Sequence, residues 1–382
     1  MPSPDERATD QRSPPASGDE GSTKTPVQTK PLDDAQRGAW FEGPDVVTAL
    51  RMYDGDIEYE LPRKSTFTLG ASRNCDIPVP GWDLSATHCL FERRGNRLRV
   101  HDQHTTNGTF CGGRRADVID LYPGDTFTPA PVTFLAMNDE MRAHRPIIAD
   151  IIGTGSTPSP DRVLVDTVKL SSHLLITGEP GCDLDRLARS IHAVSLRRSR
   201  PLVEISVLPA ERTKQREIIK RAARSTLVID LQSIEAALDS TFCAMVFSAE
   251  YHIRIIVLAP ATSTARKLLP VENVERMHHI WIRPLAERPG DIPALLDRML
   301  AERGTSLRIA DLSRRNREAL SAWEWRDNFI GLRNAADRLA AIARVPAWDT
   351  LDWRERAAAT SIPRSTLHDW FTALRLTSPL LT

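Results

Sequence analysis

The sequence predicts a multidomain chain with an N-terminal all-β sandwich, a central α/β domain and a helical C-terminal part. Its 382 residues are enough for two or three domains. From about 46 to 138, short segments of alternating polarity are separated by Gly, Pro, Asn and Asp, which is typical of a sandwich. From about 161 to 285, apolar strand-like runs alternate with helical patterns, which indicates a parallel sheet with crossover helices. Beyond 288 the period is helical.

Composition excludes several classes of protein. The 50 basic and 50 acidic residues cancel, so no global field draws the chain to nucleic acid or membrane. Its five cysteines are scattered without metal-ligand spacing, so we expect no metal site, and buried thiols in a reducing compartment. No apolar run approaches the roughly 20 residues of a membrane helix. The polar, proline-rich N-terminus is unlike a signal peptide, and we expect a cytoplasmic protein.

Shifts in pattern divide the chain into successive segments. Residues 1–44 are rich in Pro, Ser, Thr, Asp and Gln with few apolar groups, which predicts a disordered tail. The expected order after it is a β-sandwich over 45–140, a linker over 141–160, an α/β subdomain over 161–287, a helical lid over 288–346 and a terminal helix pair over 347–382.

Motifs in the first domain follow one another in a fixed order: 69-LGASRNCDIPV-79, 85-SATH-88 and 102-DQHTTNGTFCGG-113. This order resembles the forkhead-associated (FHA) domain, whose pattern runs Gly-Arg, Ser-x-x-His and Asp-x-x-Ser-Thr-Asn-Gly-Thr-Phe. The resemblance implies a β-sandwich whose loops at one end bind a phosphothreonine peptide. The implied partner is a protein phosphorylated in a Ser/Thr kinase pathway.

The resemblance assigns roles to individual residues of these loops. Ser85 and Thr106 would donate to the phosphate, and Asn107 would hold the peptide backbone. The alternative for each is a polar residue that only stabilises a turn. The residues with structural roles would be His88, which would brace the loop of Ser85, and Gly70 and Gly108, which would allow tight turns.

One family residue is missing from the first motif. The arginine that follows the glycine, and normally supplies positive charge to the phosphate, is Ala71 here. Arg73, Arg93 or Arg94 could reach the same space. Loss of one charge-assisted contact costs roughly 1.5–3 kcal/mol, so binding could be weak or directed to a partner without phosphate.

The central segment carries the stretches 174-LLITGEPG-181, 225-STLVIDLQSIEA-236 and 284-PLAERPGDIPALL-296. Together they resemble the AAA+ domain of sigma-54-dependent activators, the bacterial enhancer-binding proteins. The resemblance implies a P-loop NTPase-like α/β fold with a helical lid, formed by the stretch 323-WEWRDNFIGLRNAADR-338.

The nucleotide-binding loop lacks the residues that bind phosphate. A phosphate loop needs glycines, a lysine and a hydroxyl residue for magnesium. Gly178 and Gly181 remain, but the other positions are Asp183, Leu184 and Asp185. Two carboxylates at a helix N-terminus would fill the anion site with negative charge.

The rest of the expected ATPase machinery is also incomplete. Asp230 remains, but Leu231 replaces the catalytic glutamate and Ile330 replaces the lid arginine. Arg276 could match an arginine finger, although a solvated arginine fits it better. The interval between Glu204 and Asp230 is too short for the loop that grips sigma-54. We expect a pseudo-ATPase scaffold without catalytic residues or cofactor, in which Asp230 caps a strand.

The stretch 357-AAATSIPRSTLHDWFTAL-374 resembles the Fis-type helix-turn-helix that ends many such activators. The resemblance predicts a DNA-binding motif whose second helix presents Arg364, Ser365, Thr366 and His368 to a major groove. Nearby acidic residues offset much of the local basic charge, so a helical cap or dimerisation bundle without DNA contact stays open. A homo-oligomer is compatible with both hypotheses, the DNA-binding motif and the helical cap or dimerisation bundle.

Three functions remain after these observations. The preferred one is a phosphothreonine-binding regulator of transcription or signalling with an inactive AAA+ scaffold. The alternatives are an active ATP-dependent sigma-54 activator and a pure interaction scaffold that binds neither phosphate nor DNA.

Overall fold

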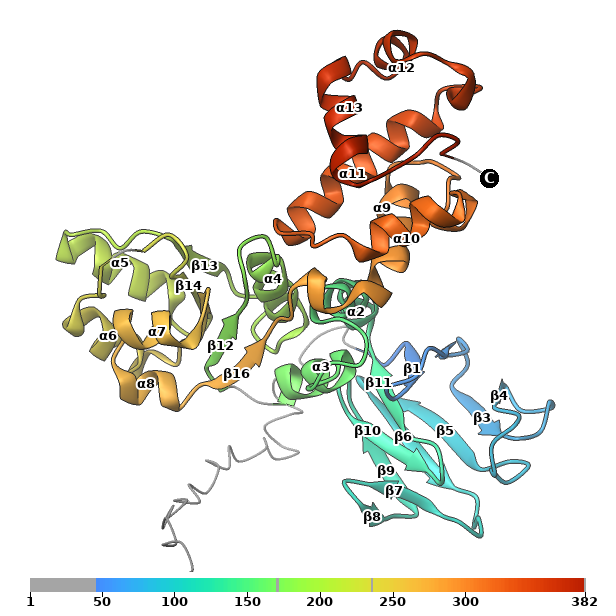
Figure 1. Ribbon diagram of the computed structural model, residues 1–382. Coiled ribbons are helices and arrows are strands. Elements are labelled where there is room, and N and C mark those ends of the chain that lie inside the picture. The colour runs from blue at the N-terminus through green and yellow to red at the C-terminus, as the bar shows by residue number, and fades with distance from the viewer. Residues whose placement is uncertain (1–45, 170–171, 235, 381–382) are drawn as a thin grey trace, which may run out of the picture.

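The computed structural model describes residues 46–169, 172–234 and 236–380, so the predicted tail over 1–44 lies outside the described residues. A β-sandwich, an α/β unit and a helical lobe follow one another along the chain (Figure 1). Among the described residues, no helix combines the length and apolarity needed to cross a membrane. The cysteines are free thiols, and all but the half-buried Cys111 are buried.

The sandwich consists of two sheets. One has the strand order β2-β1-β11-β10-β7-β8, with β1 (Ala49–Met52), β2 (Glu58–Glu60), β7 (Thr109–Cys111), β8 (Arg114–Arg115), β10 (Thr126–Pro129) and β11 (Phe134–Met137). The other has the order β4-β3-β5-β6-β9, with β3 (Thr66–Gly70), β4 (Ile77–Pro78), β5 (Cys89–Arg94), β6 (Arg97–Asp102) and β9 (Val118–Leu121). Apolar residues at alternate positions meet between the sheets, where Phe67 stacks on Phe91 at 4.9 Å.

The α/β unit is built on a five-stranded sheet in which every pairing is parallel. Its order is β13 (Leu202–Ile205), β14 (Thr226–Asp230), β15 (Arg254–Ala259), β12 (Leu174–Thr177) and β16 (His278–Trp281). The sequence indicated all of these strands except β16. That edge strand buries only Ile280 and exposes two histidines and Trp281, so it lacks the apolar run of a central parallel strand.

Helices cover both faces of this sheet. On one face, α4 (Leu184–Val194) packs with two preceding helices over Leu174 and Ile176. On the other face, over Leu175, lie α5 (Arg212–Ala222), α6 (Ser240–Val246), α7 (Thr262–Leu268) and α8 (Val271–Glu275). Since side chains alternate along a strand, the central strands β12, β14 and β15 supply apolar residues to both layers.

The segment expected as a linker over 141–160 is mainly helical. Helix α2 (Asp139–Ile152) follows β11 directly, and α3 (Pro160–Lys169) comes next. Asn138 caps α2 by accepting a bond from the Met141 N–H at 2.9 Å. Pro146 and the following glycines suggested a loop, but burial of Ile148 and Ile151 against the core outweighs that local signal.

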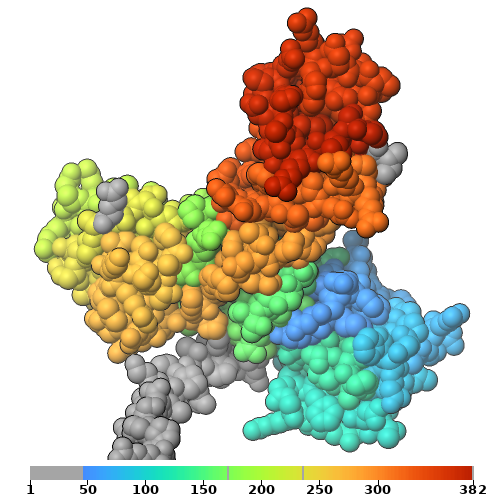
Figure 2. Space-filling model, in the orientation of Figure 1, coloured from blue at the N-terminus to red at the C-terminus, as the bar shows by residue number. Residues whose placement is uncertain are grey.

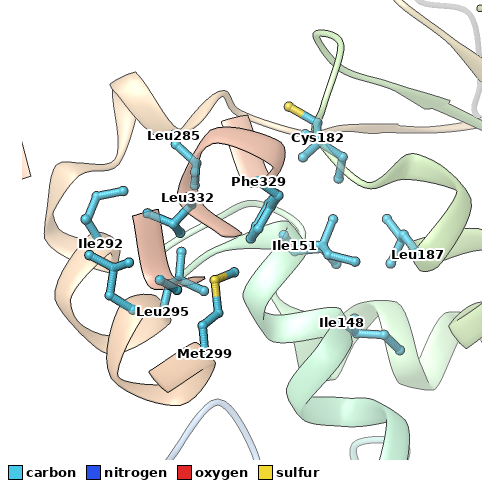
Figure 3. Packing of buried hydrophobic residues seen from close by; sticks show 14 of the residues in the cluster. Ile148, Ile151, Cys182, Leu187, Leu285, Ile292, Leu295, Met299, Phe329 and Leu332 are labelled. Atoms are coloured by element: carbon cyan, nitrogen blue, oxygen red, sulfur yellow. The ribbon is translucent and has the colours of Figure 1, made fainter. Parts of the chain in front are cut away.

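The helical lobe combines the segment expected as a lid, 288–346, which is called the lid below, with the C-terminal helices. It contains α9 (Ile292–Glu302), α10 (Arg314–Ala322), α11 (Asn328–Ala343), α12 (Trp353–Thr360) and α13 (Arg364–Ala373). Short 3-10 turns also occur: η1 (Ala249–Tyr251) lies in the α/β unit, and η2 (Leu285–Glu287), η3 (Pro289–Asp291), η4 (Ile309–Asp311) and η5 (Trp348–Thr350) lie before or within the lobe. Phe329 of the lid lies next to Ile151 of α2, with Leu187 of α4 beyond (Figure 3), so lid and α/β unit share one core.

The two C-terminal helices are not a separate unit. The buried side chain of Asn316 in α10 donates to the backbone carbonyl oxygens of Thr377, Pro379 and Leu380 at 2.9–3.2 Å. Its own oxygen accepts the Thr377 N–H at 2.8 Å. Trp370 and other apolar residues of α13 belong to the same core as the lid. Of the terminal segment predicted over 347–382, the part that the structure describes, 347–380, is therefore packed into the same core as the lid and hydrogen-bonded to α10.

Candidate functional site

Three loops at one end of the FHA-like sandwich carry the predicted phosphopeptide residues. They span 71–76 after β3, 79–88 before β5 and 103–108 after β6. The first two are joined by backbone bonds from Ala71 to Ser85 and from Ser72 to Ala86, each at 3.0 Å. Gly70 makes this approach possible, because a Cβ there would lie 2.3 Å from the Ala86 carbonyl oxygen.

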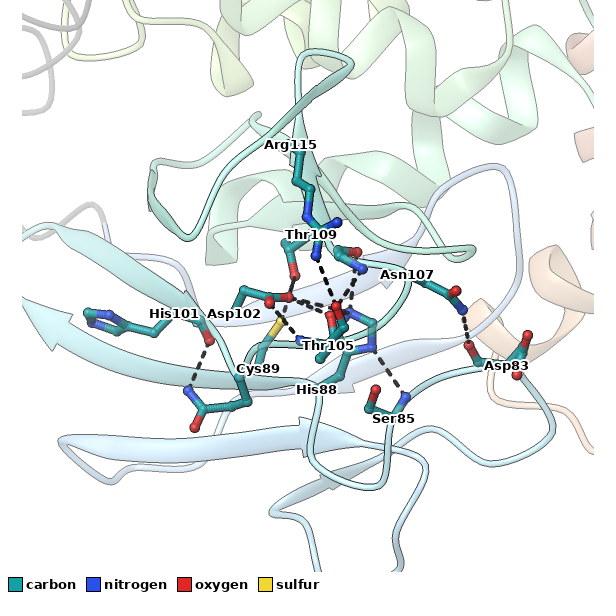
Figure 4. A network of polar contacts seen from close by, with 12 residues as sticks. Asp83, Ser85, His88, Cys89, His101, Asp102, Thr105, Asn107, Thr109 and Arg115 are labelled. Carbon is teal, nitrogen blue, oxygen red and sulfur yellow. Dashed lines mark hydrogen bonds and ion pairs between the residues drawn. The ribbon is translucent and has the colours of Figure 1, made fainter.

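His88 connects the second loop to the third (Figure 4). Its ring is fully buried, and Nδ1 accepts the Ser85 N–H at 3.4 Å. Its Nε2 lies 3.2 Å from the Thr105 hydroxyl and 3.4 Å from the Gly108 carbonyl oxygen. Since Nδ1 accepts, the proton of the neutral ring is on Nε2. Burial disfavours the charged form and lowers the pKa of His88.

Asp102 holds the third loop from within the sandwich. Its Oδ1 accepts the hydroxyls of Thr105 and Thr109, both at 2.7 Å, and its Oδ2 accepts the Thr105 N–H at 2.9 Å. Burial would raise the pKa of Asp102, but these hydrogen bonds outweigh it and the pKa is lowered. Sequence reasoning did not single out these residues, although the Asp-x-x-Thr spacing within 102-DQHT-105 is a signal for such a turn.

This buried network positions polar side chains at the surface of the loops. Ser85 is half-buried, whereas Arg73, Thr106 and Asn107 are exposed. Among the described residues, the side chains of Ser85, Thr106 and Arg73 have no hydrogen-bond or ion-pair partner. The Asn107 amide donates to the Asp83 carbonyl oxygen at 3.2 Å, which orients it toward the loop of Ser85. The three loops thus present donors that the protein itself does not use.

The arginines of β5 do not reach this end of the sandwich. Arg93 donates to the carbonyl oxygens of Val47 at 3.1 Å and Pro62 at 3.0 Å, and Arg94 pairs with Glu92 at 2.9 Å. Both lie at the opposite end of β5 from the loop that carries Ser85. The suggestion that they replace the missing family arginine is wrong, which leaves Arg73.

A further arginine lies beside the third loop. Arg115 of β8 donates to the Thr105 carbonyl oxygen at 2.9 Å. Gly108 has φ +76°, and a Cβ there would lie 2.5 Å from the Arg115 side chain. This explains the glycine by a positive φ and a close contact. Sequence reasoning missed Arg115, because its contact with Thr105 depends on how the β7–β8 hairpin folds back on the third loop.

The second candidate site is the glycine loop over 178–183, between β12 and α4. It follows the carboxyl end of a strand in a parallel sheet, where such folds bind ligands. Gly181 has φ +82°, and a Cβ there would lie 2.3 Å from the Asp327 carbonyl oxygen of the lid. The Phe329 N–H donates to the Gly181 carbonyl oxygen at 3.0 Å, and the Asn328 side-chain amide donates to the Pro180 carbonyl oxygen at 3.1 Å. The lid therefore contacts the loop directly.

An internal ion pair occupies the start of α4. Arg333 of α11 donates to both carboxylate oxygens of Asp183, at 2.5 and 2.8 Å. The Asp183 side chain is only 8% exposed, and this bond raises the pKa of Arg333. Leu184, which the sequence analysis expected at the position of a phosphate-binding lysine, is buried in the core. The pair brings an arginine of α11 to the loop, one turn after Ile330, which was expected in place of a lid arginine.

The other residues that the sequence analysis expected at a nucleotide site line an open pocket, stabilise a turn or are buried. The pocket has a volume of about 550 Å³ and is lined by Gly181, Asp183, Leu184, Asp185, Arg186, Arg189, Gln232, Ile330 and Arg333. Asp230 accepts the backbone and side-chain N–H groups of Gln232 at 3.0 and 3.2 Å. Leu231 is buried, and Gly178 packs near Leu184. No cluster of three or more potential metal-binding His, Cys, Asp or Glu residues occurs among the residues described.

The predicted DNA-contacting residues form one side of α13. Arg364, Ser365, Thr366 and His368 are exposed. The opposite side, with Leu367, Trp370 and Phe371, is buried against α12 and the lid. The turn between α12 and α13 contains Ser361 in a left-handed conformation, with φ +58°.

Comparisons with known proteins identify the type of the N-terminal domain. Residues 67–128 match the model of the FHA domain family, so the N-terminal sandwich is an FHA domain. Similar solved structures include the Slr1951 protein from Synechocystis sp., at 21% identity over 24% of this chain and 94% of that one, with a TM-score of 0.22. Mycobacterium tuberculosis EmbR in complex with a low-affinity phosphopeptide is 19% identical over 24% of each chain, with a TM-score of 0.23.

The rest of the chain has a more distant likeness. NtrX from Brucella abortus, solved in complex with ADP, is 17% identical over 62% of this chain and 73% of that one, with a TM-score of 0.41. The comparison with curated proteins found no match.

Proposed function

We propose that this protein is a phosphothreonine-binding regulator, in which the FHA domain binds a partner phosphorylated in a Ser/Thr kinase pathway. The observation that carries the proposal is the set of unused donors on adjoining loops. The hydroxyls of Ser85 and Thr106 have no partner among the described residues, while the loops beneath them are braced by buried His88. Unpaired hydroxyls on a fixed framework suit an oxyanion that arrives from outside.

Each residue has a distinct role in this proposal. The hydroxyls of Ser85 and Thr106 donate to phosphate oxygens, and the Asn107 amide binds the peptide backbone beside the phosphothreonine. Arg73 supplies positive charge from the first loop in place of the family arginine, whose position is Ala71. Because Arg73 is exposed and flexible, we expect weaker binding than a buried, preorganised arginine would give.

Titration with peptides tests the proposal. The full chain is titrated with fluorescent phosphothreonine peptides, selected by affinity capture from a peptide library, and with the same peptides unphosphorylated or carrying phosphoserine. Preference for phosphothreonine supports the assignment. Equal affinity for the phosphorylated and plain forms would remove it and favour a scaffold that recognises unmodified protein.

The central domain is proposed to be an inactive AAA+ scaffold of the sigma-54 activator type. Supporting observations are the Asp183–Arg333 pair at the phosphate position and the buried Leu184 and Leu231 in place of lysine and glutamate. A polyphosphate would meet Asp183 and Asp185 at the helix N-terminus, and no glutamate follows Asp230 to position water.

Incubation with Mg-ATP separates this proposal from an active ATPase. A pseudo-ATPase should release no phosphate above the background of a blank and should show no thermal shift. Turnover would restore the alternative of an ATP-dependent sigma-54 activator. A thermal shift without turnover would indicate that nucleotide still binds as a structural ligand.

The exposed side of α13 is proposed to contact DNA and to couple phosphopeptide binding to transcription. The support is the exposure of Arg364, Ser365, Thr366 and His368 opposite a buried apolar side. Selection of duplexes from a random library by the full chain tests it. Enrichment of one sequence that is lost with Arg364→Ala supports a specific site, whereas no enrichment favours a helical cap.

A further inference from the structure

Helix α5 lies at the outer edge of the α/β unit (Figures 1 and 2), and its sequence places several exposed basic side chains there. The helix connects edge strand β13 to β14, so one of its sides lies beyond the sheet. Its inner side buries Gln215, Ile219 and Ala222. The α5 basic row is defined as Arg212, Arg216, Lys220 and Arg224, which are all exposed and follow one another at intervals of four residues.

Three members of the α5 basic row share one side of the helix. Arg212, Arg216 and Lys220 are neighbours on the surface of α5, because residues four apart on a helix adjoin, and the helix rises about 12 Å from the first to the third. Arg224 lies two residues beyond the end of α5, in a left-handed conformation with φ +58°. Among the described residues, none of these four side chains has an ion-pair or hydrogen-bond partner. By contrast, Lys214 on another side of the helix pairs with Glu211 at 2.8 Å.

Stability of the helix does not explain this charge. Cations are favourable near the C-terminal end of a helix, which accounts for Lys220. Arg212 lies in the first turn, where the helix dipole disfavours a cation and where α5 has no acidic residue. The chain as a whole has no net charge, so the row is a local concentration and not part of a basic surface overall.

We propose that the α5 basic row binds the phosphate backbone of duplex DNA without sequence preference. Three cations spaced along about 12 Å of helix, with Arg224 beyond them, match a line of phosphates, and each contact releases counterions. A protein partner would require an apolar interface core, but the exposed residues of α5 are Thr213, one carboxylate (Glu217) and basic side chains. Single strands require aromatic platforms, and α5 has no aromatic residue. The proposal is independent of sequence-specific contacts by α13.

Salt-dependent binding tests the proposal with the full chain. Binding of a fluorescent 30-bp duplex of arbitrary sequence is measured by anisotropy at several KCl concentrations, for wild type and for R212Q/R216Q/K220Q/R224Q. Each lost phosphate contact lowers the slope of log K against log salt by about 0.9, so the variant should lose about 3 to 4 units of slope and at least about tenfold in affinity at low salt. Because the substituted residues are exposed, the melting temperature should change little.

A matched control removes the same number of charges elsewhere. R142Q/R162Q/R314Q/R326Q alters exposed or half-exposed arginines that are paired with carboxylates, and it should keep the wild-type slope. An equal loss in both variants, or no duplex binding by wild type at low salt, would overturn the proposal. Tighter binding of single-stranded DNA or duplex RNA would overturn the assignment to duplex DNA. An R364A variant that loses site selection but keeps the slope within about one unit separates this contact from α13.

Discussion

In the FHA domain, the side chains of Ser85, Thr106 and Arg73 have no hydrogen-bond or ion-pair partner among the described residues. In the glycine loop, by contrast, the side chain of Asp183 is paired with Arg333. Both regions follow strands and both resemble phosphate-binding loops in sequence. In the first, buried groups hold the loops and leave outward-facing donors unused. In the second, Arg333 of α11 supplies an internal cation to the Asp183 carboxylate of the loop.

The difference lies in which charge the protein places at each loop. A phosphate site must present donors or cations that are unsatisfied until the ligand arrives. The FHA loops meet this condition, and the glycine loop presents acidic side chains of which one is neutralised internally. The Asp183–Arg333 ion pair and the hydrogen bond from the Phe329 N–H to the Gly181 carbonyl oxygen hold α11 against the loop, and neither contact involves a nucleotide.

The largest expected effect is on phosphopeptide affinity. S85A/N107A should lower affinity for a phosphothreonine peptide about 50- to 100-fold, because the charge-assisted contact of Ser85 with phosphate contributes about 1.5 kcal/mol or more and the neutral contact of Asn107 with the peptide backbone about 1 kcal/mol. Isothermal calorimetry measures it, and Thr66→Ala on β3 is the control outside the loops. Unchanged affinity in the double variant would end the comparison, since the FHA loops would then be as inactive toward phosphate as the glycine loop.

The Asp183–Arg333 pair should contribute measurably to stability. Arg333→Met leaves the nearly buried carboxylate of Asp183 without its main partner, and we expect a loss of about 2 kcal/mol in the free energy of unfolding. Arg189→Met, on α4, removes more exposed ion pairs with Asp185 and with Glu204 of β13, and should cost less than about 1 kcal/mol in the free energy of unfolding. Urea unfolding compares them, and equal losses would mean that the first pair is only a surface contact.

Restoring the missing family arginine sharpens the comparison from the other side. Ala71→Arg should tighten phosphopeptide binding about tenfold, by adding one charge-assisted contact of roughly 1.5 kcal/mol. Arg73→Ala in the wild-type background should weaken binding by a smaller factor, and in the Ala71→Arg background it should matter less still. If Arg73→Ala has no effect in wild type, then another group supplies the positive charge.

The smallest expected effect is on pH dependence. The pKa of His88 is lowered in the folded domain by burial, so the unfolded chain binds more protons once the pH falls below the ordinary histidine value of about 6.5. Stability from neutral His88 is present above that pH and is lost as the pH falls toward the folded pKa. The difference in unfolding free energy between wild type and His88→Gln should therefore shrink from pH 7.5 to 5.5. A difference that grows on acidification would contradict the buried neutral ring.

Much of the fold follows from patterns in the sequence. The alternating segments predicted the sandwich, and the FHA match over 67–128 confirms its type. The four longest apolar runs of the α/β unit became parallel strands. The predictions failed where the local signal was weak or contrary: edge strand β16 is polar, and α2 contains Pro146 within a segment expected to be a linker. In both places packing against neighbours supplied the stabilisation that local propensity lacked.

The composition of the two loop regions was readable in advance, but their partners were not. The sequence by itself determined that Ser85 and Asn107 occur in a loop motif and that the carboxylates of Asp183 and Asp185 flank Leu184 after the glycine loop. Only the tertiary structure decided that Arg93 is committed elsewhere, that Arg115 meets Thr105, and that Arg333 closes on Asp183 from 150 residues away. The physical reason is that residue type and local spacing are encoded along the chain, whereas the choice of partner for a charged group depends on which distant segments packing brings within hydrogen-bond distance.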